Sequence, residues 1–81
     1  MNIYVGNLDY NLKENQLEEI FSEYGEVSSV KIIRDRDTGR AKGFGFIEMP
    51  DDNEAQSAMD ALNGFEVNGR SIRVSQAKQG R

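Results

Sequence analysis

The feature that most constrains the fold of this chain is the order in which the spacing of its hydrophobic residues changes along the sequence. In two separate segments, apolar residues recur three and four residues apart, which is the spacing of one face of an α-helix. Around and between these segments, apolar residues alternate with polar ones or are β-branched, which is typical of strands. The helical spacing comprises Leu17, Ile20, Phe21 and Tyr24 in the first segment and Ala55, Ala58, Met59 and Leu62 in the second.

The strand segments complete a βαββαβ order. Strands are expected at residues 2–5, 27–34 and 42–49, and a last strand is expected after a short hairpin at Asn68-Gly69. Pro50 ends the third strand, and Asp51 or Asp52 is expected to cap the second helix. Two helices must then cover one face of a four-stranded antiparallel sheet, and the other face is left toward solvent. The expected fold class is α+β with a ferredoxin-like arrangement.

Length and composition narrow the possible chemistry. With 81 residues the chain is expected to form one domain at 1–77, followed by a short basic tail at 78–81, and to be loosely ordered from Ser75 onward. There is no cysteine and no histidine, so disulfides, Cys/His zinc sites and imidazole catalysis are excluded. No apolar stretch suits a membrane span, and no signal peptide is recognisable. We expect no enzyme activity, no catalytic residue, no metal and no cofactor.

Charge is segregated along the chain, which the net charge of −4 conceals. Residues 9–26 and 48–66 contain twelve acidic residues and one lysine, whereas residues 27–47 and 67–81 contain nine basic residues and two aspartates. A local basic surface matters more to a polyanion than the total charge does. Taken alone, the same pattern also fits two solvated helix faces beside ordinary surface lysines.

The third expected strand places aromatic residues on the solvent side. Alternation puts Gly43, Gly45, Ile47 and Met49 on one face and Lys42, Phe44, Phe46 and Glu48 on the other. Because Ile47 and Met49 belong in the core, both phenylalanines point outward, and Tyr4 does so in the first strand. The glycines are expected to let the helices approach closely on the buried side. The alternative, a slip of one residue, would bury Lys42 and Glu48.

An exposed aromatic patch beside basic residues indicates a platform for unpaired bases. Every base has a π-face, so stacking on Tyr4, Phe44 and Phe46 requires no fixed sequence. Phosphates are expected to be met by four flanking residues, Arg34, Arg36, Arg40 and Lys42.

Two strand segments resemble the RNA recognition motif family. Lys42-Gly43-Phe44-Gly45-Phe46-Ile47-Glu48-Met49 is similar to the family octamer K/R-G-F/Y-G/A-F-V-x-F/Y, with five of seven specified positions matching. Ile47 replaces valine, and Met49 replaces an aromatic residue at an inward position. Ile3-Tyr4-Val5-Gly6-Asn7-Leu8 is similar to the family hexamer. The likeness extends over nearly the whole chain and is greatest to the small single-domain RNA-binding proteins of bacteria and the glycine-rich plant group.

The resemblance implies specific roles. It implies a strand order of 4-1-3-2, one base stacked on Tyr4, the next on Phe46, and Phe44 packed against the sugars. It implies a phosphate contact for Lys42, and a path across the sheet edge for Gln76–Lys78. Base edges would be reached by Asn7, Glu48, Arg73, Ser75 and Gln76.

The sequence thus predicts a monomeric protein that binds single-stranded RNA in post-transcriptional regulation or RNA chaperoning. Single-stranded DNA stays open as a second ligand, because no reader of the 2′-OH is identifiable. The alternative is a protein-interaction module that uses the same sheet face or the acidic helices. No membrane contact is expected. A cytoplasmic location is expected for a bacterial protein, and a nuclear or organellar one for a eukaryotic protein.

Overall fold

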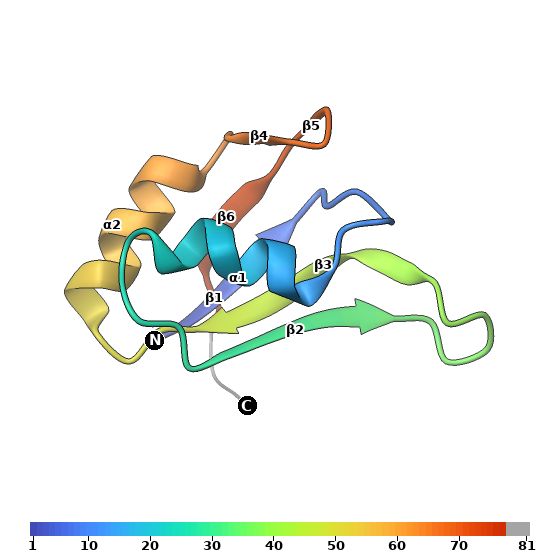
Figure 1. Cartoon of the computed structure of the whole chain (residues 1–81), viewed down its shortest axis with the longest axis horizontal. Helices are drawn as coiled ribbons and strands as arrows, with labels where there is room; N and C mark the ends of the chain where they lie inside the picture. The colour runs from blue at the N-terminus through green and yellow to red at the C-terminus, as the bar shows by residue number, and fades with distance from the viewer. Residues whose placement is uncertain (78–81) are drawn as a thin grey trace.

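A computed structural model describes residues 1–77, and its elements follow the expected βαββαβ order with one added hairpin (Figure 1). The helices are α1 (Glu14–Ser22) and α2 (Asp52–Leu62). The strands are β1 (Asn2–Gly6), β2 (Ser29–Arg34), β3 (Ala41–Glu48), β4 (Glu66–Val67), β5 (Arg70–Ser71) and β6 (Arg73–Gln76).

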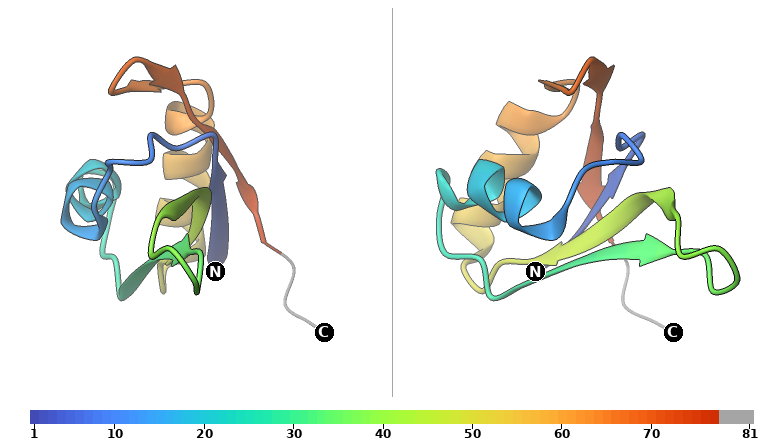
Figure 2. Two further views of the ribbon diagram at one scale, coloured as in Figure 1. Left: turned by 90° about the vertical axis from the view of Figure 1, so that its right-hand side faces the viewer. Right: turned by 45° about the vertical axis from the view of Figure 1, so that its right-hand side comes forward.

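The main sheet has four strands in the order β2-β3-β1-β6, and every neighbouring pair is antiparallel. This confirms the order implied by the resemblance, with β6 as the fourth strand, and it places the two motif strands side by side at the centre. Both helices cover the same face of the sheet (Figure 2). The opposite face is therefore the only large sheet surface left to bind a ligand within residues 1–77.

The core lies between the helices and the sheet. Each of its central side chains is at most 2% exposed. The strands and their extensions contribute Ile3, Val5, Ile47 and Met49, and the helices contribute Leu17, Phe21, Ala58 and Leu62. Both expected helical stripes therefore supply the core, with one exception. Helix α1 ends at Ser22, so Tyr24 lies in the following turn and is 37% exposed.

Helix α2 begins as its sequence predicts. Asp51 is the N-cap, and its carboxylate accepts a hydrogen bond of 3.0 Å from the backbone N–H of Glu54. This interaction satisfies one of the unpaired donors of the first turn. The hairpin between β4 and β5 also turns at the expected residues, with positive φ angles of 53° at Asn68 and 83° at Gly69.

Two expectations about local structure were wrong. Ser75 and Gln76 belong to β6, where they pair with Tyr4 and Ile3, so the ordered strand continues beyond the point expected. The glycines of β3 do not serve helix packing. A Cβ at Gly45 would collide with the backbone oxygen of Lys31, so this glycine accommodates the neighbouring strand β2 beside a register irregularity between Ile32 and Arg34.

Within residues 1–77, neither helix has the length and apolar character needed to cross a membrane.

Candidate nucleic-acid interface

Three aromatic rings form a triangle on the face of the sheet that the helices leave open. The ring centroid of Tyr4 lies 6.0 Å from that of Phe44 and 5.9 Å from that of Phe46, and the two phenylalanines are 6.2 Å apart. Phe46 is 37% exposed, and Tyr4 and Phe44 are partly exposed. Because Ile47 is 1% exposed, the slip of one residue is ruled out and the predicted strand parity is confirmed. We call these three side chains the aromatic platform.

The strand register holds the aromatic platform together. Tyr4 of β1 lies directly opposite Phe46 of β3, so their side chains stand next to each other on one face. The Tyr4 ring extends along β1 over Gly6, where a Cβ would come within 2.5 Å of the tyrosine oxygen. The rings also meet edge-to-face, with 63° between Tyr4 and Phe46 and 88° between Phe44 and Phe46. The rings therefore support one another without a ligand.

The same register identifies neighbours of the platform. Lys31 of β2 lies opposite Phe46, and Ser75 of β6 lies opposite Tyr4. Glu48 lies opposite Asn2 on one side and Ser29 on the other. The sequence reasoning missed Lys31. Alternation along residues 29–34, with Val30 and Ile32 inward, would have found it.

Arg34 does not stand free beside the platform. Its guanidinium forms an ion pair of 3.1 Å with Glu14 at the start of α1, on the helix side of the molecule. The pKa of the Glu14 carboxyl lies below its usual value, chiefly because the backbone N–H of Glu14 hydrogen-bonds to it and also because of Arg34. Of the expected phosphate ligands, Arg34 is therefore already partly neutralised.

Arg36 and Arg40 are exposed in the loop that joins β2 to β3, and Asp35 shapes this loop. The Asp35 carboxylate accepts hydrogen bonds of 2.8 Å and 3.1 Å from the backbone N–H groups of Asp37 and Thr38. These bonds lower the pKa of Asp35, and the nearby charge of Lys42 adds to the effect. Lys42 is exposed at the end of β3 that adjoins this loop.

Asn7 is held by two hydrogen bonds at the end of β1. Its Nδ2 donates to the backbone oxygen of Ser71 at 2.7 Å, and its Oδ1 accepts from Arg70 Nη2 at 2.8 Å. The backbone of Asn7 has a positive φ of 58°. The structure thus gives Asn7 a structural role in joining β1 to the β4–β5 hairpin.

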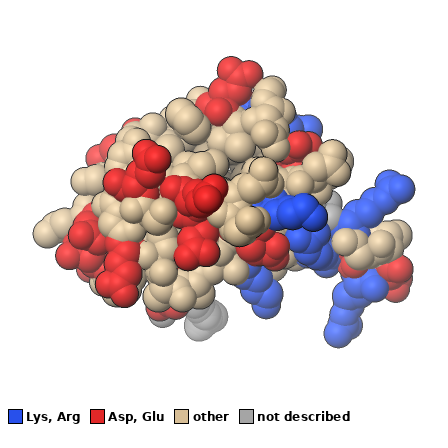
Figure 3. Space-filling model, viewed as in Figure 1, with Lys and Arg blue, Asp and Glu red and all other residues tan. Residues whose placement is uncertain are grey.

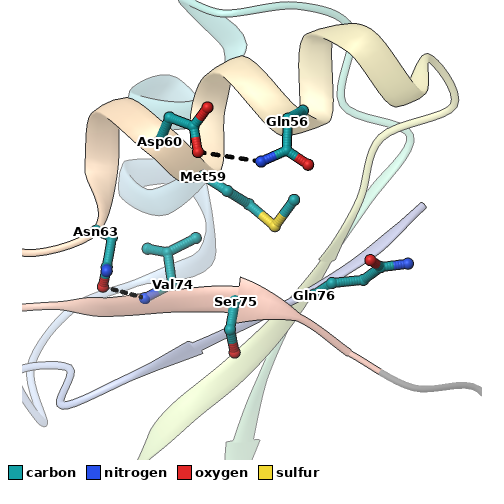
Figure 4. Close-up of a pocket in the computed structure, with 7 residues that line it drawn as sticks. All are labelled: Gln56, Met59, Asp60, Asn63, Val74, Ser75 and Gln76. Carbon is teal, nitrogen blue, oxygen red and sulfur yellow. Dashed lines mark hydrogen bonds between the residues drawn. The ribbon is translucent and has the colours of Figure 1, made fainter.

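The residues expected on β6 divide between the two faces of the sheet. Arg73 and Ser75 lie opposite Gly6 and Tyr4, so both stand on the platform side. Gln76 lies opposite the buried Ile3 and lines a hollow beside α2 with Gln56 and Met59, whereas Ser75 points away from α2 (Figure 4). The side chain of Gln76 is therefore not placed on the aromatic face. Lys78 lies outside the described residues.

The surface charges have opposite signs at the two ends of the molecule. Acidic side chains gather over the helices, and lysine and arginine gather at the end formed by the β2–β3 loop (Figure 3). Among residues 1–77 no group of three or more His, Cys, Asp or Glu side chains is suitably placed to hold a metal ion.

This fold and this surface define a class of protein: a small α+β domain whose four-stranded sheet is covered by helices on one face and carries aromatic side chains on the other. The chain belongs to the RNA recognition motif family, which matches residues 3–73.

The relatives agree with this assignment. RbpB of Nostoc sp. (strain PCC 7120) is described by its name as an RNA-binding protein by inference. It is 50% identical to this chain over 78 residues, which cover 96% of this chain and 76% of RbpB. The 29 kDa ribonucleoprotein B of Nicotiana sylvestris chloroplasts is 47% identical over 77 residues, covering 95% of this chain and 26% of that protein.

Solved structures show the same architecture. The crystal structure of RNA Binding Protein PG1 superposes with a TM-score of 0.95 at 46% identity, covering 100% of this chain and 98% of that one. The Rna15 domain with bound RNA (GU) superposes with a TM-score of 0.86 at 32% identity, covering 96% of this chain and 83% of that one.

Proposed function

We propose that this protein binds single-stranded RNA by stacking one base on Tyr4 and the next on Phe46, with Phe44 against the sugars between them. The observation that carries this proposal is the aromatic platform, whose ring centroids lie 5.9 Å to 6.2 Å apart on the open face of the central strands. Stacking on such rings contributes about 1–3 kcal/mol per base. The family, the relatives' names and the RNA-bound Rna15 domain support the same ligand.

The polar neighbours of the platform supply the remaining contacts. Phosphates are contacted by Lys31 and Lys42 and by Arg36 and Arg40 of the β2–β3 loop. Arg73 contacts the RNA strand from β6. Base edges are contacted by Ser75 from the outer strand β6 and by Glu48 from the end of β3. Lys78, beyond the described residues, and the polar groups of Gln76 extend the path across the sheet edge. Arg34 and Asn7 contribute less, because each already has an intramolecular partner.

A binding role without catalysis is the function proposed, and it would serve post-transcriptional regulation or RNA chaperoning. The cyanobacterial and chloroplast sources of the relatives suit a cytoplasmic or organellar protein. The alternative is a protein-interaction module that uses the same sheet face or the acidic helices, and a C-terminal segment folded over the rings would favour it. Through Ala77 the chain leaves Phe46 exposed, which favours the nucleic-acid reading.

The test is a titration with short RNA of randomised sequence. Phe46→Ala and Tyr4→Ala should each weaken binding by about 1–3 kcal/mol, because each removes one stacking surface. The matched control is Tyr24→Ala, which removes a ring of equal exposure on the opposite side of the molecule and should leave the affinity unchanged. Circular dichroism should show that all three variants remain folded.

The ligand form is tested with the same measurement. Two stacked bases on a domain of negative net charge should give a dissociation constant on the order of micromolar or weaker. Duplex RNA should bind poorly because its bases are already stacked in pairs. Single-stranded DNA of matched sequence shows whether the 2′-OH is read. If Phe46→Ala and Tyr4→Ala both titrate like the unmodified protein, the platform is not the binding surface.

A further inference from the structure

A mainly apolar hollow lies on the helix side of the molecule, away from the surface proposed for RNA. It is lined by Ile20, Glu23, Tyr24, Leu62 and Phe65, and its volume is about 180 Å³. One wall comes from the end of α1 and the turn after it, and the other comes from the end of α2 and the segment that leads to β4. Both helices cover the face of the sheet opposite the aromatic platform (Figure 2). A ligand in this helix-side hollow would therefore leave the platform open.

Two aromatic rings at the helix-side hollow are exposed although their backbone is fixed. Tyr24 is 37% exposed and Phe65 is 48% exposed. The N–H of Tyr24 donates a hydrogen bond of 3.0 Å to the oxygen of Phe21. The N–H of Phe65 donates to the oxygen of Leu62 at 2.9 Å, and the oxygen of Phe65 accepts from the N–H of Ile72 at 3.0 Å. The packed fold itself thus presents an apolar patch, which is typical of an interaction surface.

The charge around the helix-side hollow has a single sign. Residues 14–30 and 51–69, which contain both helices and both walls, hold five acidic residues each and no lysine or arginine. Acidic side chains gather over the helices (Figure 3). Within residues 1–77, ion pairs engage only Glu14 and Asp52 of this set. A phosphate backbone is repelled by such a surface, and a cationic chain is attracted to it.

Glu23 stands at a position where its charge destabilises the helix. It is the C-cap residue of α1, and the last turn of α1 contains no basic residue. The C-terminal end of a helix carries a partial negative charge, so a carboxylate there is unfavourable. No ion pair within residues 1–77 offsets this repulsion. A positive group from a partner would relieve it at the edge of the helix-side hollow.

These features define the chemistry of the occupant. The hollow requires a large apolar side chain, and the surrounding carboxylates require lysine or arginine beside it. A second copy of this chain does not offer that combination, because its basic β2–β3 loop region, residues 34–42, contains no large apolar residue. A basic segment of a different protein does offer it.

We propose that the helix-side hollow binds a basic peptide segment of a partner protein, which inserts one aromatic or branched aliphatic side chain beside Tyr24 and Phe65. Carboxylates that include Glu23 pair with the lysine and arginine residues that flank the inserted side chain. This inference goes beyond the proposed function and does not depend on it, because the two surfaces lie on opposite sides of the sheet. The protein would then hold RNA and a protein partner at the same time.

The experiment is an amide NMR titration of the whole chain with a synthetic heptapeptide of sequence KRSWSRK. Amide signals of residues 20–24 and 62–66 should shift, and those of β1 and β3 should not. Replacing the tryptophan of the peptide with serine should weaken binding about tenfold or more, because the hollow loses its apolar occupant. Replacing the four basic residues with glutamate should abolish binding.

Variants of the protein test the two parts of the surface separately. Phe65→Ser and Tyr24→Ser should each weaken the tryptophan peptide about fivefold or more, because each removes an apolar wall. Tyr10→Ser, the same change at a tyrosine that is 62% exposed before α1, should have no effect. Glu23→Gln should weaken the peptide about twofold at low salt without lowering the melting temperature, which a purely structural carboxylate would not do. Circular dichroism should show that every variant remains folded.

The remaining outcomes would overturn the proposal. Equal binding of the tryptophan and serine peptides would mean that only charge is recognised and that the hollow takes no side chain. Shifts confined to β1 and β3 would place the peptide on the sheet face. If signals of residues 20–24 and 62–66 move with protein concentration in the absence of peptide, a second copy covers the surface. The proposed function is judged apart from this, because Phe46→Ala should leave peptide binding unchanged and Phe65→Ser should leave RNA binding unchanged.

Discussion

At the scale of single residues, the site depends on which side of a strand each side chain takes. Phe46 reaches solvent because its neighbours Gly45 and Ile47 face the interior, and Ile47 is 1% exposed. Gly45 contributes in a second way. Strand β2 passes so close to it that a Cβ there would collide with the Lys31 oxygen, and Lys31 is itself the register neighbour of Phe46. The same glycine thus lets β2 bring a lysine beside the platform.

Gly45→Ala is expected to destabilise the domain by about 1–3 kcal/mol, because strand β2 must move to admit the methyl group. Urea unfolding followed by circular dichroism measures the loss. Gly39→Ala is the comparison, since its Cβ would meet nothing within 4 Å and only its positive φ of 74° is strained. That strain should cost about 1 kcal/mol. A Gly45→Ala variant as stable as the unmodified protein would show that β2 does not need this space.

At the scale of elements, helix α2 and the β2–β3 loop both depend on aspartates that accept backbone hydrogen bonds. Asp51 caps α2, and Asp35 organises the loop that carries Arg36 and Arg40. In each case the short aspartate side chain accepts hydrogen bonds from backbone N–H groups that have no partner in the local backbone. The cap stabilises the core-forming helix, whereas the loop aspartate orders the loop that carries Arg36 and Arg40.

Asp51→Ala should lower the free energy of unfolding by about 1 kcal/mol, because the N–H of Glu54 loses its acceptor. Asp51→Asn retains a side-chain oxygen at the same place and should keep most of that stability. Thermal or urea unfolding of the three proteins tests this. Equal losses for the alanine and asparagine variants would assign the effect to charge and not to the cap.

Asp35 should titrate below its usual range. Its pKa is lowered by the N–H groups of Asp37 and Thr38, so the folded-state value lies below the unfolded value. The order that it confers on the loop is then complete above the unfolded pKa and is lost as the pH falls through the lower folded value. Carboxyl carbon NMR of the folded protein and of an unfolded peptide compares the two midpoints. A folded midpoint at or above that of the peptide would contradict the assigned hydrogen bonds.

At the scale of the whole molecule, charge separation explains how an acidic protein can bind a polyanion. The net charge is −4, yet the acids lie over the helices and the bases gather at the β2–β3 end (Figure 3). The acidic surface therefore lies over the helices, and the basic surface lies at the loop end of the sheet. A local basic surface of this kind attracts a polyanion although the chain as a whole is negative.

Arg40→Ala should flatten the dependence of RNA affinity on salt. Loss of one phosphate contact lowers the slope of log K against log salt by about 0.7 for a single strand. Lys13→Ala is the matched control, because it removes the same charge at the start of α1 and should leave the slope unaltered. A common slope for both variants and the unmodified protein would mean that Arg40 meets no phosphate.

Much of the fold and the platform was predictable because it depends on local geometry. A strand alternates its side chains with period two and a helix with period 3.6, so Phe44, Phe46 and the apolar stripes could be assigned from spacing alone. The cap at Asp51 and the turn at Asn68-Gly69 are equally local. Tyr24 departed from this rule because α1 ends at Ser22, two residues before the stripe does.

Only the tertiary structure decides the contacts between segments that lie far apart in the chain. Arg34 forms an ion pair with Glu14, and Asn7 is hydrogen-bonded to Arg70 and Ser71. The register that pairs Gln76 with Ile3 places Gln76 on the helix side of the sheet. The contacts of Tyr10 with Gly43 and Arg70 likewise require β3 and β5 to meet the segment that follows β1. Spacing along one segment carries no information on such partners, because each contact depends on how separate strands and loops are brought together by the packed core.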